Sequence, residues 1–458
     1  MKKVMILLPR GEAIRNFVYT GFLDELAKTH QLIVYSVVNL QFQNEQIELR
    51  AFPEERPTKG HSQVRRMLDI AHEYHTNSVR HRYGRKIRFH RAIGLEKLKE
   101  FVKHALGFMI SGKWTLNRLN ALENRLHLQN PAASYWGQIL QKEKPNWLLN
   151  TSHIHGFGSE LPCKVALSMG VPVYGFVFSW DNLTTRSRIT IHYDKLFLWH
   201  ARMKAILSHQ YGTEHALTKN AIVTGTPQFD THQSINEVIS KRALLGYLNI
   251  SDEDESVGIV LYSTAMATDF PQEHFIIRDL INWFEDEECN IQNRILVIRP
   301  YIKGITEELR MMMEQSYKRI RFMPVLWEEA YFTPKREDAK YYKAILNYAS
   351  VGINIASTVS LELMIYGTHV INIGFDHPKT NYSSVYKYEQ HLEYDHYKEV
   401  VDGGGVHVAT SMPHLFQLIE TLCEAEINHK GIAFMNWFFD GKLTFNSTQK
   451  ILNHVQKA

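Results

Sequence analysis

The chain has 458 residues, of which 44% are apolar and 22% charged, a composition typical of a folded globular protein. This length exceeds what one hydrophobic core usually supports, so two domains are expected. A formal net charge of +4 is too small to be typical of a nucleic-acid-binding protein, and we expect no nucleic acid among the partners.

Membrane insertion, secretion and metal binding are each disfavoured by the sequence. No apolar stretch reaches the roughly 20 residues that a transmembrane helix needs. The apolar run Val4–Leu8 follows two lysines but is too short for a secretion signal, and no small-residue cleavage site follows it. Cys163, Cys289 and Cys423 lie far apart, and the 24 histidines are scattered. We therefore expect a cytoplasmic protein without disulfides or a bound metal.

Short apolar runs alternate with amphipathic stretches in the first half of the chain. A helix is expected over Phe17–Lys28. The polar residues 41–60 predict a loop, and residues 61–145 read as mostly helical, an insertion without a clear strand. The predicted strands are 3–9, 31–38, Asn146–Leu149, Val171–Phe178, Lys195–Trp199 and Ala221–Thr224. Such alternation predicts a parallel sheet covered by helices.

A second series of strands follows residues 231–256, which read as a helix and an acidic turn that link two domains. The aromatic-rich residues Phe434–Val455 predict a C-terminal helix. The predicted strands of this second half are 257–263, 294–300, 320–324, 351–355 and 369–373.

The predicted class is therefore α/β, with two Rossmann-like parallel-sheet domains facing a cleft. The first domain is expected at 1–232, with a helical insertion at about 61–145. The second is expected at 233–432. A helix at 433–458 is expected to pack back across the domains.

Ligands of parallel sheets bind beyond the carboxyl ends of the strands, so residues that follow strands are the site candidates. Val351–Asp376 reads as strand, tight turn, helix and strand. Ser357 and Thr358 lie where the helix begins, and backbone N–H groups there can bind an anion. Glu362 follows one turn later on the same face. A phosphate at the helix start and a sugar hydroxyl on Glu362 would suit a nucleotide-sugar, although an ordinary capped βαβ unit has the same pattern.

Two further strand ends of the second domain carry polar side chains. Ser263 and Thr264 end the strand at 257–263, and Arg299 ends the strand at 294–300. An arginine at such a position can contact a phosphate through two N–H groups. Together with the helix start, these residues offer donors and acceptors suited to a sugar diphosphate.

In the first domain, the earliest strand is followed by Arg10, Gly11, Glu12, Arg15 and Asn16. Glycine allows a ligand to approach the backbone closely. Glu12 has two interpretations, a general base for an acceptor hydroxyl or a cap for the helix that starts near it.

Two more loops of the first domain are candidates. His153 and His155 follow the strand at Asn146–Leu149, and either could act as a base or bind phosphate, or simply be solvated. Asp181 lies in the loop after Val171–Phe178 and could be a base or hold its loop through an Asx turn.

These motifs resemble those of GT-B glycosyltransferases. The likeness rests on VTGTPQFD at 223–230, SWDNLTTR at 179–186 and NIASTVSLELMIYGTHVINIGFD at 354–376, and covers about residues 146–410. It is strongest to the branch that shares features with nucleotide-sugar 2-epimerases and CDP-glycerol glycerophosphotransferases, found among bacterial surface-carbohydrate proteins.

The resemblance implies a nucleotide donor in the second domain. Ser357 and Thr358 match positions near the donor phosphates, and Glu362 matches an acid that commonly binds ribose hydroxyls. Arg299 stands where relatives often carry a basic residue with a nearby histidine, which this chain lacks. Relatives usually need no metal, and the acidic run at 252–255 lies in the linker, ahead of a strand, where it reads as a solvated turn.

The expected function is therefore a metal-independent glycosyltransferase of surface-glycan or glycolipid assembly, with a nucleotide-sugar as substrate and no cofactor. Ser263 and Thr264 join the donor-binding set, whereas Arg10, Arg15, Asn16 and His153 lie on the acceptor side. Glu12, His155 and Asp181 are the candidate bases. The alternatives are a CDP-alcohol-dependent polyol-phosphate transferase, a sugar-nucleotide epimerase and a non-catalytic nucleotide- or glycan-binding protein.

Residues 80–104 form a basic segment with nine Lys or Arg against two Glu, interleaved with apolar side chains. Such a stretch can lie on an anionic membrane or hold an anionic acceptor, although a solvated helix face has a similar pattern. If the acceptor is lipid-linked, this segment is the expected contact with the inner face of the cytoplasmic membrane.

Overall fold

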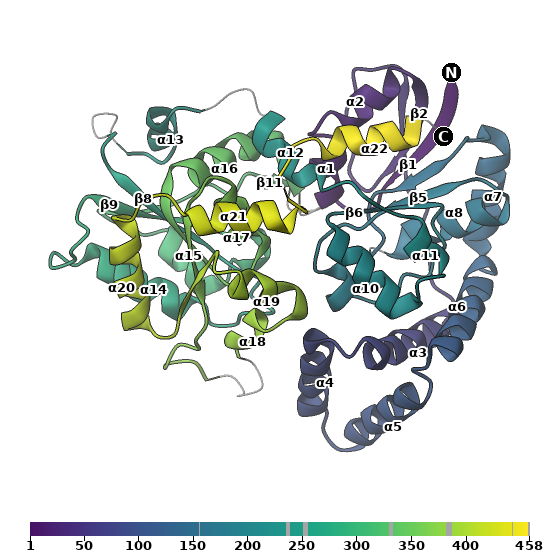
Figure 1. Cartoon of the computed structure of the whole chain (residues 1–458), viewed down its shortest axis with the longest axis horizontal. Helices are drawn as coiled ribbons and strands as arrows, with labels where there is room; N and C mark the ends of the chain where they lie inside the picture. Colours follow the sequence, from purple (N-terminus) through teal and green to yellow (C-terminus); the bar gives the residue numbers. More distant parts are fainter. Residues whose placement is uncertain are drawn as a thin grey trace. The chain divides into compact units, whose positions relative to one another are not determined.

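The computed structural model describes residues 1–154, 156–234, 239–250, 255–328, 333–381, 387–441 and 443–456 (Figure 1). The chain forms two compact units. Unit 1 comprises Met1–Ser234, Ala330–Thr333 and Thr444–Ala458, and unit 2 comprises Ile235–Glu329 and Pro334–Leu443. Within the described ranges, no helix combines the length and the apolar composition needed to cross a bilayer.

Unit 1 contains a seven-stranded sheet in the order β3-β2-β1-β4-β5-β6-β7, with every neighbouring pair parallel. The inner strands are buried on both faces, as expected when helices cover a parallel sheet. The strands are β1 (Lys2–Leu8), β2 (His30–Ser36), β3 (Ile47–Ala51), β4 (Leu148–Asn150), β5 (Val173–Phe176), β6 (Lys195–Leu198) and β7 (Ala221–Val223).

Strand β3 corrects the prediction of a loop over 41–60. Ile47–Ala51 pairs with β2 along its length, at the edge of the sheet. Its polar composition hid it because an edge strand needs few apolar residues. Glu48 and Arg50 form an ion pair on its exposed side, with Nε and Oε1 2.7 Å apart.

The helix expected over Phe17–Lys28 is two helices, α1 (Glu12–Phe17) and α2 (Phe22–Ala27). Gly21 separates them with a φ of 76°, a left-handed conformation that glycine adopts without a steric penalty. The helices of unit 1 between β4 and the end of residue range 1–234 are α8 (Gly156–Ser168), α9 (Asn182–Thr185), α10 (Ala201–Tyr211), α11 (Ala216–Lys219) and α12 (Pro227–Ser234).

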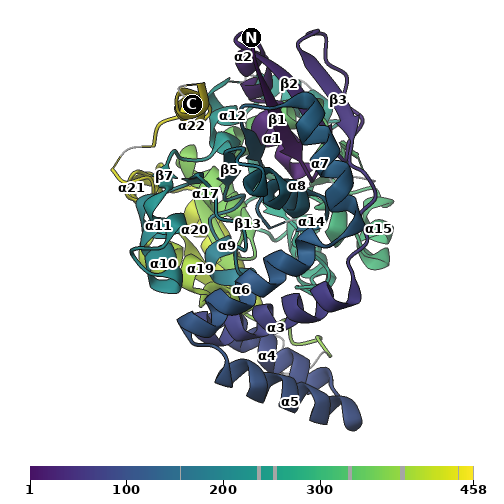
Figure 2. The ribbon, with the colours of Figure 1, turned by 90° about the vertical axis from the view of Figure 1, so that its right-hand side faces the viewer.

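Residues between β3 and β4 form five helices. These helices are labelled α3 to α7 in Figure 2. Side-chain caps begin three of them: Thr58 and Ser78 accept from the backbone N–H groups of His61 and His81, and Asn130 caps the last. Helix α3 packs against the three that follow it. The five are α3 (Lys59–Thr76), α4 (Val79–Arg91), α5 (Leu95–Met109), α6 (Lys113–Leu128) and α7 (Pro131–Glu143).

Unit 2 contains a six-stranded sheet in the order β10-β9-β8-β13-β14-β15, again with parallel pairs. The two sheets confirm the predicted α/β class. The first five strands in chain order coincide with predicted ones, and the three-residue β15 was missed. The strands are β8 (Gly258–Ser263), β9 (Arg294–Arg299), β10 (Ile320–Phe322), β13 (Ala349–Asn354), β14 (His369–Ile373) and β15 (His407–Ala409).

Helices surround the second sheet, and its core is formed by apolar residues of the strands with α14 and α20. The helices are α13 (Lys241–Tyr247), α14 (His274–Glu285), α15 (Glu307–Met313), α16 (Arg336–Tyr348), α17 (Thr358–Ile365), α18 (Glu389–Leu392), α19 (Asp395–Asp402), α20 (Met412–Cys423) and α21 (His429–Phe438), with a 3-10 turn at Ile302–Gly304. Two short strands, β11 (Trp327–Glu328) and β12 (Thr333–Pro334), form a separate two-stranded sheet.

The C-terminal segment is two helices rather than the one predicted. Asp440 and Gly441, with φ of 59° and 119°, break it after α21, which packs on α17. The second helix, α22 (Ser447–Gln456), belongs to unit 1. There the Asp230 carboxylate accepts from the N–H groups of Ser447 and Thr448, at 3.1 and 2.6 Å, and anchors the helix start.

Candidate functional site

The strand order of unit 2 reverses between β8 and β13. From β8 the chain proceeds outward through β9 and β10, and from β13 it proceeds outward on the other side. Ligands of open parallel sheets bind outside the carboxyl ends of strands at such a reversal. Tyr262 pairs with Ile353, so Ser263 at the end of β8 lies beside the end of β13. The fold thus places the strand end that carries Ser263 and Thr264 beside the turn that carries Ser357 and Thr358.

The turn from β13 into α17 is held by buried hydrogen bonds. The Ser357 hydroxyl caps the helix by accepting from the N–H of Val359 at 3.2 Å, the capping role expected from the sequence. The Asn354 side-chain oxygen accepts from the Ser357 N–H at 3.3 Å and from the Ser360 hydroxyl at 3.0 Å. Asn372 donates to the same oxygen at 3.2 Å. This network fixes the start of α17, whose first-turn N–H groups are of the kind that binds phosphate.

Glu362 is buried one turn into α17 and is linked to Arg299 through Tyr342. The Tyr342 hydroxyl donates to Glu362 Oε2 at 2.5 Å. The Arg299 guanidinium lies 4.2 Å from the centre of the Tyr342 ring, and its Nη2 donates to Asp338 at 2.8 Å. Burial opposes the charged form of Arg299, but Asp338, Tyr342 and Glu362 together more than offset it and raise the pKa of the guanidinium. Arg299 is therefore a charged link that positions Tyr342 and Glu362, rather than a free arm at a strand end.

Ser263 and Thr264 differ in how their hydroxyls are used. Thr264 Oγ1 accepts from the N–H of Tyr301 at 2.8 Å. Ser263 Oγ is buried and has no hydrogen-bond partner within the part of the chain that the structure describes. A buried hydroxyl without a partner is uncommon in native proteins and indicates a place for water or a ligand group.

Sequence reasoning missed Glu273, which lies beneath the loop after β8. Its carboxylate accepts from the N–H of Ala265 at 3.1 Å and from the Tyr262 hydroxyl at 2.9 Å. Burial raises its pKa to about 7. No local pattern marks this residue, because it lies ten positions after the strand end and is followed by an ordinary helical stretch.

The strand order of unit 1 reverses between β1 and β4 in the same way. Thr151 donates to the Leu7 carbonyl through its N–H at 3.2 Å and its hydroxyl at 2.7 Å, so the loop after β4 lies beside the end of β1. The fold therefore brings the segment from Arg10 to Asn16 to the same edge of the sheet as His153.

Glu12 does not cap helix α1. The cap position is Gly11, without a side-chain hydrogen bond, and Glu12 is the first helical residue. Its carboxylate pairs with Arg10, with Nη2 and Oε1 3.0 Å apart. On the same helix Asn16 is fully buried, and neither its amide nitrogen nor its amide oxygen has a partner among the described residues; Arg15 Nε is in the same state.

The remaining candidates of unit 1 differ in chemistry. His153 is buried, its Nδ1 lies 3.3 Å from the Phe176 carbonyl, and burial lowers its pKa to about 4, so it is neutral near pH 7. Asp181 accepts from the Thr185 hydroxyl at 2.7 Å, a contact that holds its own loop. His155 lies outside the described residues.

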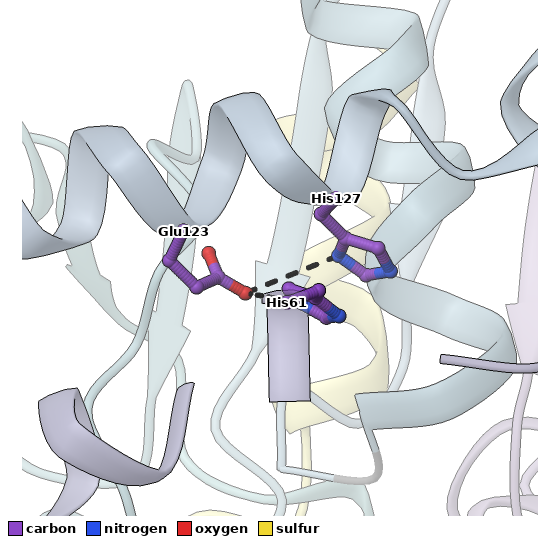
Figure 3. A group of neighbouring side chains, drawn as sticks. All are labelled: His61, Glu123 and His127. Carbon is purple, nitrogen blue, oxygen red and sulfur yellow. Dashed lines mark hydrogen bonds and ion pairs between the residues drawn. The ribbon is translucent and has the colours of Figure 1, made fainter. Parts of the chain in front are cut away.

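A buried cluster of His61, Glu123 and His127 has residue types that bind metals (Figure 3). Lys164 lies where a cation would bind, because its Nζ is 2.8 Å from both Glu123 oxygens and 3.0 Å from His127 Nδ1. His61 contacts Glu123 at 2.8 Å. Burial alone would raise the pKa of Glu123, but His61 and Lys164 lower it to about 2. The cluster is an ion network that ties α3 and α6 to α8.

Comparisons with known proteins agree on the fold. No family model and no curated protein matches this chain. The solved structure of S. aureus MnaA with UDP is similar with a TM-score of 0.56 at 11% identity, covering 100% of this chain and 96% of that one.

Two UDP-GlcNAc 2-epimerases are similar as well. The enzyme from Methanocaldococcus jannaschii has a TM-score of 0.55 at 13% identity, and the Neisseria meningitidis enzyme bound to UDP-GlcNAc has 0.53 at 12%, each covering 100% of both chains. At such identities the likeness shows the fold alone, and the GT-B-type fold predicted from the sequence is confirmed.

Replacing Lys164 tests the ion network. Lys164→Met leaves the Glu123 carboxylate buried without its closest cation, and we expect the free energy of unfolding to fall by about 3–5 kcal/mol. Adding Glu123→Gln should recover most of the loss, since the buried charge is then gone. Urea unfolding measures both, with the exposed Lys142→Met as control; equal stability of Lys164→Met and the wild type would contradict the assignment.

Glu273 gives unit 2 a pH-dependent stability. Its pKa is about 7 in the folded protein against an ordinary 4.5, so the folded state keeps a proton that the unfolded chain releases between these values. This contribution is fully present below pH 4.5 and is lost as the pH rises to 7. Glu273→Gln should gain stability relative to the wild type from pH 5 to 8, by at most about 3 kcal/mol. Thermal melts across this range measure the gain; a constant difference, like that expected of the exposed Glu314→Gln, would refute it.

Proposed function

We propose that the protein binds a nucleotide-sugar in unit 2 and transfers the sugar to a hydroxyl acceptor, as a glycosyltransferase. The observation that carries this proposal is the juxtaposition, at the β8/β13 reversal, of a capped helix start with the buried, positioned carboxylate Glu362. The fold adds support, because solved proteins that share it were determined with UDP or UDP-GlcNAc.

The proposed donor contacts follow from the chemistry of each group. The diphosphate binds at the N-terminus of α17, where the N–H groups after Ser357 carry partial positive charge. The unpartnered Ser263 hydroxyl lies at the neighbouring strand end and supplies a further hydrogen bond. Glu362 accepts from ribose hydroxyls, with its orientation set by Tyr342.

The proposed reaction breaks the bond between the anomeric carbon and the diphosphate oxygen. Negative charge then develops on the leaving diphosphate, and the N–H groups at the helix start stabilise it, while Arg299 acts indirectly by positioning Tyr342 and Glu362. The acceptor oxygen forms the new bond to the anomeric carbon, and its proton goes to a base, for which the strand-end edge of unit 1 offers Glu12. His153, with a lowered pKa, accepts a proton poorly and fits a hydrogen-bonding role.

Nucleotide binding to the native state raises the melting temperature by mass action, so a thermal-shift screen tests the donor site. We expect a selective shift with UDP or GDP and their sugar conjugates. Glu362→Gln should weaken binding about tenfold or more, because it loses a charge-assisted hydrogen bond worth roughly 1.5–3 kcal/mol. The control is again Glu314→Gln. No shift with any nucleotide, or equal binding by Glu362→Gln, would refute the site.

Assays on the same purified protein distinguish two related activities from glycosyl transfer. A preference for cytidine nucleotides would instead support a polyol-phosphate transferase with a CDP-alcohol donor. The named 2-epimerases that share the fold make epimerisation the second candidate function. Proton NMR of UDP-GlcNAc incubated with the protein alone distinguishes it, because an epimerase forms a new sugar without an acceptor. Binding without turnover in either assay would indicate a non-catalytic protein.

We further propose that the acceptor is lipid-linked and that α5 contacts an anionic membrane surface. Its outward face is apolar: Leu98 is 60% exposed, Phe101 62% and Met109 68%. In both views α5 lies farther from the sheet of unit 1 than α3 does (Figures 1 and 2). Exposed lysines Lys97 and Lys99 flank the apolar face, a pattern typical of helices that lie in the headgroup region of anionic bilayers.

Vesicle co-sedimentation tests this contact. The protein should bind phosphatidylglycerol vesicles and not phosphatidylcholine vesicles, with weaker binding at high salt. Leu98→Asp with Phe101→Asp should reduce the bound fraction several-fold without unfolding, since both side chains are exposed. The matched control is Met311→Asp, an apolar side chain of unit 2 that is 52% exposed. Equal binding to both lipids, or no effect of the double substitution, would refute the contact.

A further inference from the structure

A cavity of about 700 Å³ lies in unit 1, apart from the residues that follow the strands. Its walls come from α6, from the segment after α9, and from the end of α10 with the turn after it. The polar lining residues are Asn117, Asn120, Asn124, Arg125, Gln129, Arg188, His192, Tyr211 and His215. This volume is ample for a small organic ligand, and none of the residues assigned above to the donor or acceptor lines it.

Arg188 is a buried cation without a carboxylate partner among the described residues. The residue is 3% exposed, and its Nη2 donates to the Asn117 side-chain oxygen at 2.8 Å. Its Nε and Nη1 are buried and have no partner in the described chain. No Asp or Glu is among the described residues that line the cavity. Burial lowers the pKa of this guanidinium, and the nearby Tyr211 hydroxyl only partly offsets it.

A buried charge without a counterion is strongly unfavourable, and buried arginines are normally paired with an acid. The Arg188 guanidinium stacks on the Tyr211 ring, 4.2 Å from its centre, but this contact supplies no negative charge. Arg65, in the same unit, shows the normal case, because its Nη1 lies 2.9 Å from Glu160. Arg188 instead lines a cavity together with a second arginine, Arg125, and its Nε and Nη1 have no partner among the described residues. An anion in the cavity would supply the missing partner.

Two asparagines on α6 add acceptors to the same wall. Asn120 and Asn124 lie one turn apart, and both donate through Nδ2 to the Thr190 carbonyl at 3.1 Å. Their side-chain oxygens are consequently left buried without a donor among the described residues. A ligand that satisfies them must carry hydroxyl or N–H groups in addition to its negative charge.

The rest of the polar lining includes aromatic side chains that are neutral near pH 7. His192 and His215 have ring centres 5.3 Å apart, and His215 lies 5.1 Å from Tyr211. Burial lowers the pKa of both histidines, that of His215 to about 4, so neither competes with Arg188 for the anion near pH 7.

We propose that this cavity is a binding site for a small polyhydroxylated anion, a sugar carrying a carboxylate or a phosphate. Arg188 binds the anionic group through Nε and Nη1, and Asn120 and Asn124 accept from its hydroxyls. The site is independent of the proposed donor site in unit 2, so it stands or fails without the proposed transferase activity.

Calorimetric titration of the full chain tests the proposal with four probes: glucuronate, glucose 6-phosphate, inorganic phosphate and neutral glucose. We expect one or both sugar anions to bind and glucose not to bind; which anion binds identifies the carboxylate or the phosphate class. Arg188→Met should weaken binding at least tenfold. Asn124→Ala should weaken binding of the sugar anion and leave that of inorganic phosphate unchanged.

Asn117→Asp is the sharpest variant, because it is isosteric and places a carboxylate against Arg188 Nη2. We expect it to raise the melting temperature of the ligand-free protein and to abolish anion binding, since the charge is then paired internally. If Arg188→Met does not fold, Asn117→Asp still tests whether anion binding depends on the unpaired charge of Arg188. The matched control is Asn453→Asp on the exposed face of α22, which should change neither property.

The proposal is wrong if no anion binds, or if binding is unchanged by Asn117→Asp and Arg188→Met. Equal affinity for inorganic phosphate and both sugar anions would overturn the saccharide part, because Asn120 and Asn124 would then contribute nothing. A lower melting temperature in Asn117→Asp would show that Arg188 does not lack a partner.

Discussion

Parallel pairing of every strand in the two main sheets is the constraint on which both candidate sites depend. Because the strands of each sheet run the same way, all their carboxyl ends lie at one edge. The reversals of strand order, at β1/β4 and at β8/β13, then decide which strand ends are neighbours. The second reversal joins Ser263 to the turn at Ser357, residues that are 94 positions apart in the chain. The pairing of β8 with β13 is enough to place Ser263 and Ser357 near each other, and no contact between their side chains is needed.

Buried charge separates structural clusters from sites that await a ligand. Around Glu123 each charge has a partner of opposite sign, and Lys164 takes the position that a metal would need, so this cluster holds helices together. Arg299 is similar, because the Asp338 carboxylate pairs with its positive charge. Its guanidinium also stacks on Tyr342, whose hydroxyl donates to Glu362. Arg188 is the contrast: two of its N–H groups have no partner among the described residues, and it lines a cavity whose described lining contains no acid. Compensated charge explains stability, whereas uncompensated charge calls for a partner from outside.

Features that depend on residues close together in the chain were predicted, whereas features that depend on distant residues were missed. Ser357 was recognised as a cap because the hydroxyl, the helix and the two flanking strands lie within 26 residues. Strand β3 was missed because pairing with β2, rather than its own apolar pattern, makes it a strand. Glu273 and Arg188 were missed because their unusual states come from burial beside residues of other elements. The basic segment was found by counting charge, but the apolar face of α5 extends beyond it to Met109.

The sequence by itself determined the α/β class, most of the strands, and the polar residues that follow them, because apolar runs, caps and turns act between neighbours in the chain. Only the tertiary structure decided which strand ends adjoin and that Arg299 positions Tyr342. It alone created the cavity around Arg188, which combines residues from 117 to 215. The physical reason is that desolvation and ion pairing depend on distance in space, and a chain of 458 residues sets those distances only when it folds.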